Sequence, residues 1–339
     1  MQAIAPLEAF LLERLFGQAD AIREFSSAVE RAEHGPRRQC RPRAFLLLLG
    51  PTGTGKTEMV KLAAQFLYGD ACPDRLERFD MGEYQHADSV LRLLGSPGQP
   101  ALLGAAVDRL KLRGGGILLL DEIEKAHPDL LTVLLSFDDA RTTMADGSTK
   151  DLSGCYVIMT SNLGAAEAAL MANCGYSAIR RKVVREAEAK LRKETVARFT
   201  SVIVMNILSF DVQERIVRRL LETEIALQSG HCRRHLEIAG PGVVTFLIGK
   251  GFSPDMGARH IRGIVERYVG DALRLYSPNR CSPDAECEGE GLLGDRWTRG
   301  LVIEVQADAL VSLPLRRSDA FSELLARHGA LTAPTPLLS

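Results

Sequence analysis

Apolar runs alternate with segments of helical periodicity over the first 205 residues. Residues 45–49, 116–120 and 155–159 are continuously apolar, which is typical of buried strands, and 77–81 and 202–205 are shorter candidates. From Met59 to Leu67 the apolar residues recur every three or four positions, as in a helix with one apolar face. Further helices are expected over 1–16, 21–32, 89–94, 101–113, 129–137 and 179–199, the last long and exposed because it is strongly charged, and a hairpin over 142–151.

The pattern changes after Leu208, where we place a domain boundary. The elements expected beyond it are helices from Phe210, over 243–248 and over 261–273, and a strand at 301–305. Residues 277–294 are rich in Pro, Gly, Cys and acids, so we interpret them as a surface loop. The tail after Arg317 is expected to hold one short helix, 321–327, and a mobile end.

Length and composition limit the class of protein. The 339 residues suffice for about two domains, and 46% of them are apolar, which is ample for a core. The formal net charge of −1 provides no global field for nucleic acid or an anionic membrane. No apolar run approaches the roughly 20 residues that span a bilayer, and Glu8 and Glu13 interrupt the N-terminal segment where a signal peptide would be apolar. We therefore expect a cytoplasmic protein without a membrane partner, whose seven scattered cysteines are free thiols.

A glycine-rich segment stands between the first apolar run and the helix that follows it, and it reads Gly50-Pro51-Thr52-Gly53-Thr54-Gly55-Lys56-Thr57. Strand, glycine-rich turn, Lys-Thr and helix is the context of a phosphate-binding P-loop. The glycines let backbone N–H groups turn toward phosphate oxygens, and the positive end of the helix dipole adds to the attraction. Lys56 is expected to reach the β- and γ-phosphates, and the Thr57 hydroxyl to bind Mg²⁺.

Two adjacent carboxylates, Asp121 and Glu122, follow the apolar run at 116–120. Beside a P-loop, the two carboxylates of a strand-end pair are expected to have different functions. Asp121 is expected to hold Mg²⁺ directly or through water, and Glu122 to orient and deprotonate the attacking water.

Asn162 stands at the end of the third apolar run. An amide at that position, level with the carboxylates, can hold a water near a γ-phosphate. The alternative, an Asn that caps the following turn, stays open.

These motifs together resemble those of the AAA+ ATPases of the Clp type, specifically the second ATPase domain of the Clp disaggregases. The resemblance runs from about Leu15 to Val305. Its most specific parts are Gly50–Glu58, Asp80–Tyr84, Leu120–Asp129 and Val157–Gly164. The run Glu124-Lys125-Ala126-His127-Pro128 discriminates far better than the carboxylate pair alone.

The resemblance implies an α/β fold. Residues 1–207 would form a three-layer P-loop AAA+ domain around a parallel sheet, 208–315 a small, mostly helical lid, and 316–339 a C-terminal tail. It also implies ATP and Mg²⁺, bound between the subunits of a ring that is usually a homo-hexamer.

Individual positions take their roles from the same resemblance. Phe16, in Leu15-Phe16-Gly17-Gln18, matches the segment that packs near adenine, and Glu58 completes the P-loop match. Asn162 matches the family's sensor residue. Arg198 matches the arginine finger supplied by the adjoining subunit, although several of its neighbours depart from the usual pattern. Arg259, in Gly257-Ala258-Arg259, matches the arginine sensor that touches the γ-phosphate of its own subunit.

One departure from the family concerns the loop that grips polypeptide. Threading Clp proteins carry an aromatic residue in a Gly-Tyr-Val-Gly pore loop, but here the region is short, reads Gly95 to Gly104, and no Phe, Tyr or Trp occurs between Tyr84 and Phe137. An aromatic side chain grips by inserting a large flat apolar surface, and Leu102 or Leu103 would replace it only weakly. No apolar tripeptide of the kind that docks such ATPases on a peptidase is found.

The resulting expectation is an ATPase that hydrolyses Mg-ATP and remodels an unknown protein partner through ring assembly, without full threading. The alternative is an ATP-dependent scaffold that closes a ring or filament on a partner complex or nucleic acid, although the near-neutral charge does not indicate nucleic acid. A P-loop kinase is disfavoured, because a water-activating Glu beside the Mg²⁺ Asp suits hydrolysis better than transfer to a bound acceptor.

Overall fold

The computed structural model describes residues 4–36, 41–96, 98–135, 137–232, 236–238, 240–252, 257–275, 301–306 and 309–314. The chain divides into two compact units, Met1–Ile216 with Phe252–His260, and Val217–Gly251 with Ile261–Ser339. The predicted loop at 277–294, the helix at 321–327 and the tail 316–339 lie outside the described residues. The domain boundary near Leu208 and the lid stay predictions.

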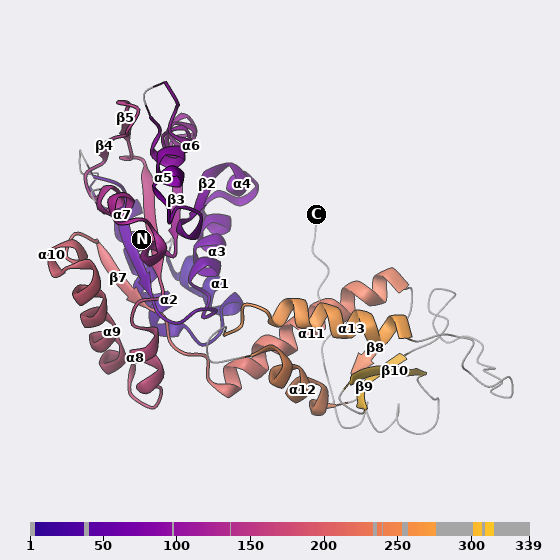
Figure 1. Cartoon of the computed structure of the whole chain (residues 1–339). Coiled ribbons are helices and arrows are strands. Elements are labelled where there is room, and N and C mark those ends of the chain that lie inside the picture. Colours follow the sequence, from indigo (N-terminus) through magenta and orange to yellow (C-terminus); the bar gives the residue numbers. More distant parts are fainter. Residues whose placement is uncertain are drawn as a thin grey trace, which may run out of the picture. The chain divides into compact units, whose positions relative to one another are not determined.

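A five-stranded parallel sheet organises the described part of the first unit (Figure 1). Its order is β2-β3-β6-β1-β7, with bounds Leu76–Asp80, Gly116–Asp121, Cys155–Ser161, Ala44–Leu49 and Ser201–Val204. Every residue of β1, β3 and β6 is buried, as the continuous apolar runs predict. Because carboxyl ends of parallel strands meet at one edge, the segments after β1, β3 and β6 lie side by side. The predicted α/β fold with a parallel sheet is confirmed.

Helices cover both faces of this sheet. Alternate strand residues point to opposite faces, so Leu46 and Leu48 pack with one group of helices and Leu47 and Leu49 with the other. The first group is α1 (Ile4–Arg14), α2 (Ala19–His34) and α3 (Lys56–Tyr68); the second is α5 (Ala87–Leu94), α6 (Leu102–Leu112), α7 (Pro128–Leu134), α8 (Ala165–Leu170) and α9 (Tyr176–Leu191).

The prediction of one long exposed helix over 179–199 is wrong. Helix α9 ends at Leu191, and a separate short helix, α10, spans Lys193–Val196. Between them Arg192 has φ 68° and ψ 141°, a conformation that costs a residue with a side chain on the order of 1–3 kcal/mol. One face of α9 is buried through Ile179, Val183, Ala187 and Leu191. The many charged residues between these positions obscure this apolar face in the sequence.

The region where the resemblance would place the pore loop forms a tight turn. Ser96 and Gln99 exchange backbone hydrogen bonds of 3.0 and 2.8 Å. The turn is tied to the hairpin of β4 (Arg141–Thr143) and β5 (Thr149–Asp151), because Ala101 N donates to Asp146 Oδ2 at 3.2 Å and Ala145 N donates to Leu94 O at 2.9 Å. The predicted hairpin is therefore present, and it holds the short loop in place.

The second unit is not purely helical. It contains α11 (Phe210–Cys232) from Val217 on, α12 (Pro241–Gly251) and α13 (Ile261–Leu275), together with a three-stranded sheet of order β10-β9-β8. The strands are β8 (Leu236–Ile238), β9 (Leu301–Gln306) and β10 (Ala309–Pro314). Only β9 was predicted, because β8 is three residues long and β10 follows β9 so closely that the two run together in the sequence. Across the described residues, no helix is both long and apolar enough to cross a membrane.

Candidate functional site

The P-loop is shaped by glycines that no other residue could replace without strain. Gly50, Gly53 and Gly55 have φ of 133°, 72° and 99°. A Cβ on Gly50 would lie 2.8 Å from Met205 O, and one on Gly55 would lie 2.6 Å from Leu15 Cδ1. The loop thus turns tightly between β1 and α3, and its closeness to the core excludes side chains at these two positions.

Gln18 fastens the P-loop to the rest of the unit. Its buried side chain donates through Nε2 to Thr54 O at 3.2 Å and to Asn206 O at 2.9 Å, and its Oε1 accepts from Asn206 N at 2.8 Å. The neighbouring Phe16, predicted to lie near adenine, is half-buried, and the Arg215 guanidinium lies 4.7 Å from the centre of its ring. The place of this segment near adenine stays a prediction, and the anchoring role of Gln18 was not foreseen from the sequence.

Lys56 lies inside the loop with 6% of its surface exposed. Its Nζ donates to Gly50 O at 2.6 Å, to Pro51 O at 2.8 Å and to Asn162 Oδ1 at 2.9 Å. Burial lowers the pKa of Lys56 to about 8, although three nearby carboxylates act in the opposite direction, Glu124 the most strongly. The ammonium group is therefore held ready beside the loop that would take phosphate.

Thr57 and Asp121, the two predicted metal ligands, lie together. Thr57 Oγ1 is 3.0 Å from both carboxylate oxygens of Asp121, which is 2% exposed. Thr160 donates to Asp121 Oδ1, and Arg78 donates to Oδ2 through Nη2 at 2.8 Å and Nε at 3.2 Å. Thr160 and Arg78 were missed from the sequence, because each belongs to a strand that meets β3 only in the folded sheet.

Glu122 is buried and paired with two cations. Arg259 Nη2 donates to Oε1 at 3.0 Å, and Lys125 Nζ lies 2.5 Å from Oε2. Burial by itself would raise the pKa of Glu122, but the hydrogen bonds from Lys125 and Arg259 outweigh it and lower the pKa to about 2. The backbone of Glu122 is left-handed, with φ 58°, and its N–H donates to Thr160 Oγ1 at 3.0 Å. The carboxylate is thus ionised at neutral pH, and the left-handed backbone of Glu122 sets the direction of its side chain.

Asn162 connects Lys56 to a third carboxylate, Glu124. Glu124 Oε1 accepts from Asn162 Nδ2 at 2.9 Å and from Asn162 N at 3.1 Å. Because the amide nitrogen faces Glu124, and more distantly Glu122 at 3.5 Å, the amide oxygen faces Lys56. Glu124 was recognised in the sequence only as part of a family motif, and its contact with Asn162 was not foreseen.

The Glu124 contact predicts a difference between two substitutions. Glu124 Oε2 is buried and has no hydrogen-bond partner among the described residues. Glu124→Ala should lower the free energy of unfolding by about 2 kcal/mol, because two donors of Asn162 lose a charged acceptor. Glu124→Gln should cost less than Glu124→Ala, since its amide oxygen can accept the same two bonds from Asn162. Urea denaturation followed by circular dichroism measures both, and equal losses would contradict this account.

Arg259 reaches Glu122 from a segment that packs on the P-loop within the first unit. Ala258 N donates to Gly53 O at 3.2 Å, and a Cβ on Gly257 would lie 2.4 Å from Thr52 O. Gly257 also has a left-handed φ of 54°. Both the lack of space for a Cβ and the backbone conformation therefore require glycine at this position. The structure therefore brings Arg259 to Glu122, and the predicted contact of Arg259 with a γ-phosphate stays a prediction.

Arg198 is not joined to these residues by any hydrogen bond in the described part of the chain. Its guanidinium, half-exposed beyond the end of α10, donates to Asp138 Oδ1 at 3.3 Å. Glu58 lies exposed in the first turn of α3. Ten residues are joined to one another around the P-loop, and we name this set the P-loop group. Its members are Lys56, Arg78, Thr57, Asp121, Glu122, Glu124, Lys125, Thr160, Asn162 and Arg259.

The P-loop group suits Mg²⁺ and a polyphosphate. Mg²⁺ prefers oxygen ligands such as carboxylates, and the Thr57 hydroxyl and the Asp121 carboxylate, which lie within 3.0 Å of each other, would be able to hold it. The described residues contain no group of three or more His, Cys, Asp or Glu that could hold a metal ion. Beside nucleotides Mg²⁺ usually takes most of its ligands from phosphate and water, and Thr57 and Asp121 would be its ligands from the protein.

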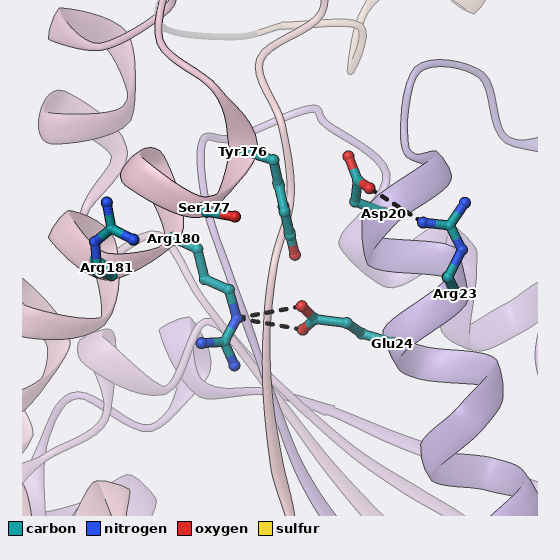
Figure 2. Close-up of a pocket in the computed structure, with 7 residues that line it drawn as sticks. All are labelled: Asp20, Arg23, Glu24, Tyr176, Ser177, Arg180 and Arg181. Carbon is teal, nitrogen blue, oxygen red and sulfur yellow. Dashed lines mark hydrogen bonds and ion pairs between the residues drawn. The ribbon is translucent and has the colours of Figure 1, made fainter.

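A cavity of about 380 Å³ lies elsewhere in the first unit, between the beginnings of α2 and α9 (Figure 2). Arg180 reaches across it to Glu24 and donates to Val202 O at 3.0 Å, while Tyr176 donates to Val204 O at 3.2 Å. Val202 and Val204 belong to β7, the edge strand of the sheet. These contacts satisfy carbonyl groups that an edge strand would otherwise expose, so we interpret this place as structural.

Comparison with known proteins agrees with the motifs. Residues 41–202 match the AAA domain (Cdc48 subfamily). The chain is 34% identical over 280 residues to chaperone protein ClpB 1 of Nostoc sp. and 38% identical over 274 residues to chaperone protein ClpB of Rhizobium meliloti. These alignments cover 80% and 79% of this chain but 31% of each relative.

A probable chaperone protein ClpB 1 of Chlorobaculum tepidum is 33% identical over 296 residues, which are 80% of this chain and 64% of that protein. The chain thus spans less than a third of the first two relatives and about two thirds of the third. Residues 41–202 belong to the AAA family of ATPase domains, and the similarity to ClpB over four fifths of the chain identifies it as a Clp-type member.

Proposed function

We propose that this chain binds and hydrolyses Mg-ATP and uses the energy to remodel a protein partner. The P-loop group is the observation that carries the proposal, because it gathers a buried lysine, a Thr–Asp pair, an ionised glutamate and an oriented amide beside a P-loop at one edge of the sheet. Names of ClpB relatives as chaperones support protein remodelling as the purpose. Mg²⁺, when bound, would neutralise charge on the transferring phosphoryl group.

Several members of the P-loop group have a proposed part. Lys56 would leave the carbonyl oxygens of Gly50 and Pro51 for phosphate oxygens, which carry more negative charge. Thr57 and Asp121 would hold Mg²⁺. Asn162 would position the attacking water, because Glu124 fixes the orientation of its amide.

Arg259 and Glu122 would act in succession. A carboxylate with a pKa of about 2 is a weak base. If Arg259 exchanged Glu122 for the γ-phosphate, one of the two cations that depress this pKa would be removed. Glu122 would then be able to orient and deprotonate water only while the triphosphate is bound.

We further propose that copies of the chain assemble into a ring, with a homo-hexamer as the expected form, and that Arg198 serves the nucleotide of the adjoining copy. Processive threading is not part of the proposal. The turn at Ser96 and Gln99 is tied to the β4–β5 hairpin, and no aromatic side chain is available there. The same two features favour the alternative, a scaffold that ATP closes on a partner and hydrolysis releases.

The first test is nucleotide binding by wild-type protein and by Lys56→Ala. Lys56→Ala should weaken ATP binding about 10- to 100-fold, since a charge-assisted hydrogen bond contributes about 1.5–3 kcal/mol. Lys61→Ala is the matched control, because Lys61 lies exposed on the same helix. Calorimetric titration with a slowly hydrolysed ATP analogue measures both, and equal affinity in the two variants would contradict the proposal.

Remodelling and scaffolding differ in the consequence of ATP binding. Gel filtration with and without the analogue, together with phosphate release in the presence of unfolded protein, separates them. Turnover stimulated by unfolded protein supports remodelling. Analogue-induced assembly without such stimulation supports the scaffold, and salt-dependent binding to DNA would identify a nucleic-acid partner.

A further inference from the structure

Arg78 lies on the candidate metal ligand. It belongs to β2, the neighbour of β3, and two of its nitrogens contact the same oxygen of Asp121, Nη2 at 2.8 Å and Nε at 3.2 Å. The Asp121 side chain is 3% exposed, whereas that of Arg78 is 42% exposed. A solvent-accessible cation thus neutralises a buried carboxylate.

A second carboxylate is within reach of the same guanidinium. Asp80 Oδ2 lies 4.0 Å from Arg78 Nη2, and the Asp80 side chain is 41% exposed. Asp80 and Asp121 are paired across β2 and β3, and Arg78 stands two residues before Asp80, on the same face of the sheet. Arg78 can therefore move from one carboxylate to the other by side-chain rotation alone.

The other cations of the P-loop group have different partners. Lys56 is held by two carbonyls and Asn162, while Lys125 and Arg259 are both held by Glu122. Arg78 is consequently the cation that a metal at Asp121 would encounter first. A dication and a guanidinium that share one carboxylate repel each other, and the repulsion is weakly screened where the carboxylate is buried.

We infer that Arg78 competes with Mg²⁺ for Asp121 and transfers to Asp80 when the metal binds. Arg78 is then a positioning residue that sets how strongly the metal is held. The inference rests on the proposed function, because it assumes that Mg²⁺ binds at Asp121. Without metal, Arg78 keeps the buried carboxylate neutralised and in place.

The movement of Arg78 to Asp80 would make the segment after β2 respond to metal binding at Asp121. Asp80 Oδ1 accepts from Gly82 N at 2.9 Å and so begins the short helix Met81–Glu83. Tyr84, directly after that helix, accepts from His127 N at 3.0 Å through its carbonyl. A guanidinium arriving at Asp80 would change the charge at the start of this segment, which leads to α5 and the turn at Ser96.

The test compares Arg78→Gln, Arg78→Lys and Asp80→Asn with wild-type protein. Fluorescently labelled ADP is the probe, and its dissociation constant is measured once in EDTA and once in excess Mg²⁺. The ratio of the two constants reports how much the metal strengthens nucleotide binding, and no hydrolysis is needed. Melting temperatures in EDTA verify that each variant is folded.

Arg78→Gln should raise this ratio about tenfold, because it removes the competing charge and keeps a hydrogen-bonding side chain. Arg78→Lys should remain near the wild-type ratio, since it keeps the charge. Asp80→Asn should lower the ratio, because the displaced cation loses its second partner. An unchanged or smaller ratio in Arg78→Gln would overturn the inference, whereas wild-type protein that binds no ADP under either condition would overturn the proposed function as well.

Discussion

Replacing Glu122 by glutamine should leave ATP bound and slow its hydrolysis by about 10²–10⁴-fold, the usual contribution of a positioned general base. Glutamine has nearly the same shape and can keep the left-handed backbone of this position, φ 58°. Its amide oxygen can still accept one hydrogen bond, from Arg259 or from Lys125. It cannot take a proton from water, so chemistry is lost while binding remains.

Single-turnover phosphate release and equilibrium binding of ATP measure the two effects separately. Glu83→Gln is the matched control, because Glu83 is an exposed acid in the short helix after β2, and it should hydrolyse ATP at the wild-type rate. Steady turnover by Glu122→Gln at the control rate would refute the role assigned to this residue. If Glu122→Gln lost ATP binding as well as hydrolysis, Glu122 would instead have a structural role in shaping the site.

The site residues that could be predicted from the sequence are those that belong to a local motif, recognisable from the residues next to them in the chain. The P-loop, Asp121, Glu122 and Asn162 each follow a buried strand, and a parallel sheet brings strand ends to one edge. A local motif therefore suffices to place them. Arg259 was placed by resemblance alone, and the structure shows how its segment is held on the P-loop, through the hydrogen bond from Ala258 N to Gly53 O.

The residues that were missed act across strands or along distant segments. Arg78 reaches Asp121 only because β2 pairs with β3, and Gln18 reaches Asn206 over 188 positions. Neither distance can be inferred from spacing in the sequence. Arg192, which separates α9 from α10, was missed for another reason: a left-handed φ is expected at glycine and not at arginine.

Replacing Arg198 by alanine should leave ATP binding nearly unchanged and lower the rate of hydrolysis about 10³-fold or more, the effect of arginines supplied across an interface in other P-loop enzymes. Arg198 pairs only with Asp138 among the described residues, at 3.3 Å, and its side chain is 50% exposed. An exposed ion pair of this kind contributes about 0–1 kcal/mol. The guanidinium can therefore leave Asp138 for a phosphate of an adjoining copy at little cost.

Mixing two inactive variants distinguishes an arginine that acts between copies from one that acts within a copy. Arg198→Ala retains a complete P-loop group, and Lys56→Ala retains Arg198. If Arg198 serves its neighbour, the mixture regains activity wherever an Arg198→Ala pocket adjoins a Lys56→Ala copy. Arg259 contacts Glu122 of its own chain, so mixing Arg259→Ala with Lys56→Ala should restore nothing.

Arg181→Ala is the control for loss of an exposed arginine, because Arg181 lies on α9, near Arg198 in the chain, and borders the cavity between α2 and α9. It should retain full activity. Three results would each refute a shared site: full activity of Arg198→Ala, full activity of a monomer isolated by dilution, or failure of the Arg198→Ala and Lys56→Ala mixture to recover while both variants still assemble. Recovery in that mixture, without recovery in the Arg259→Ala mixture, can arise only if two copies build one pocket.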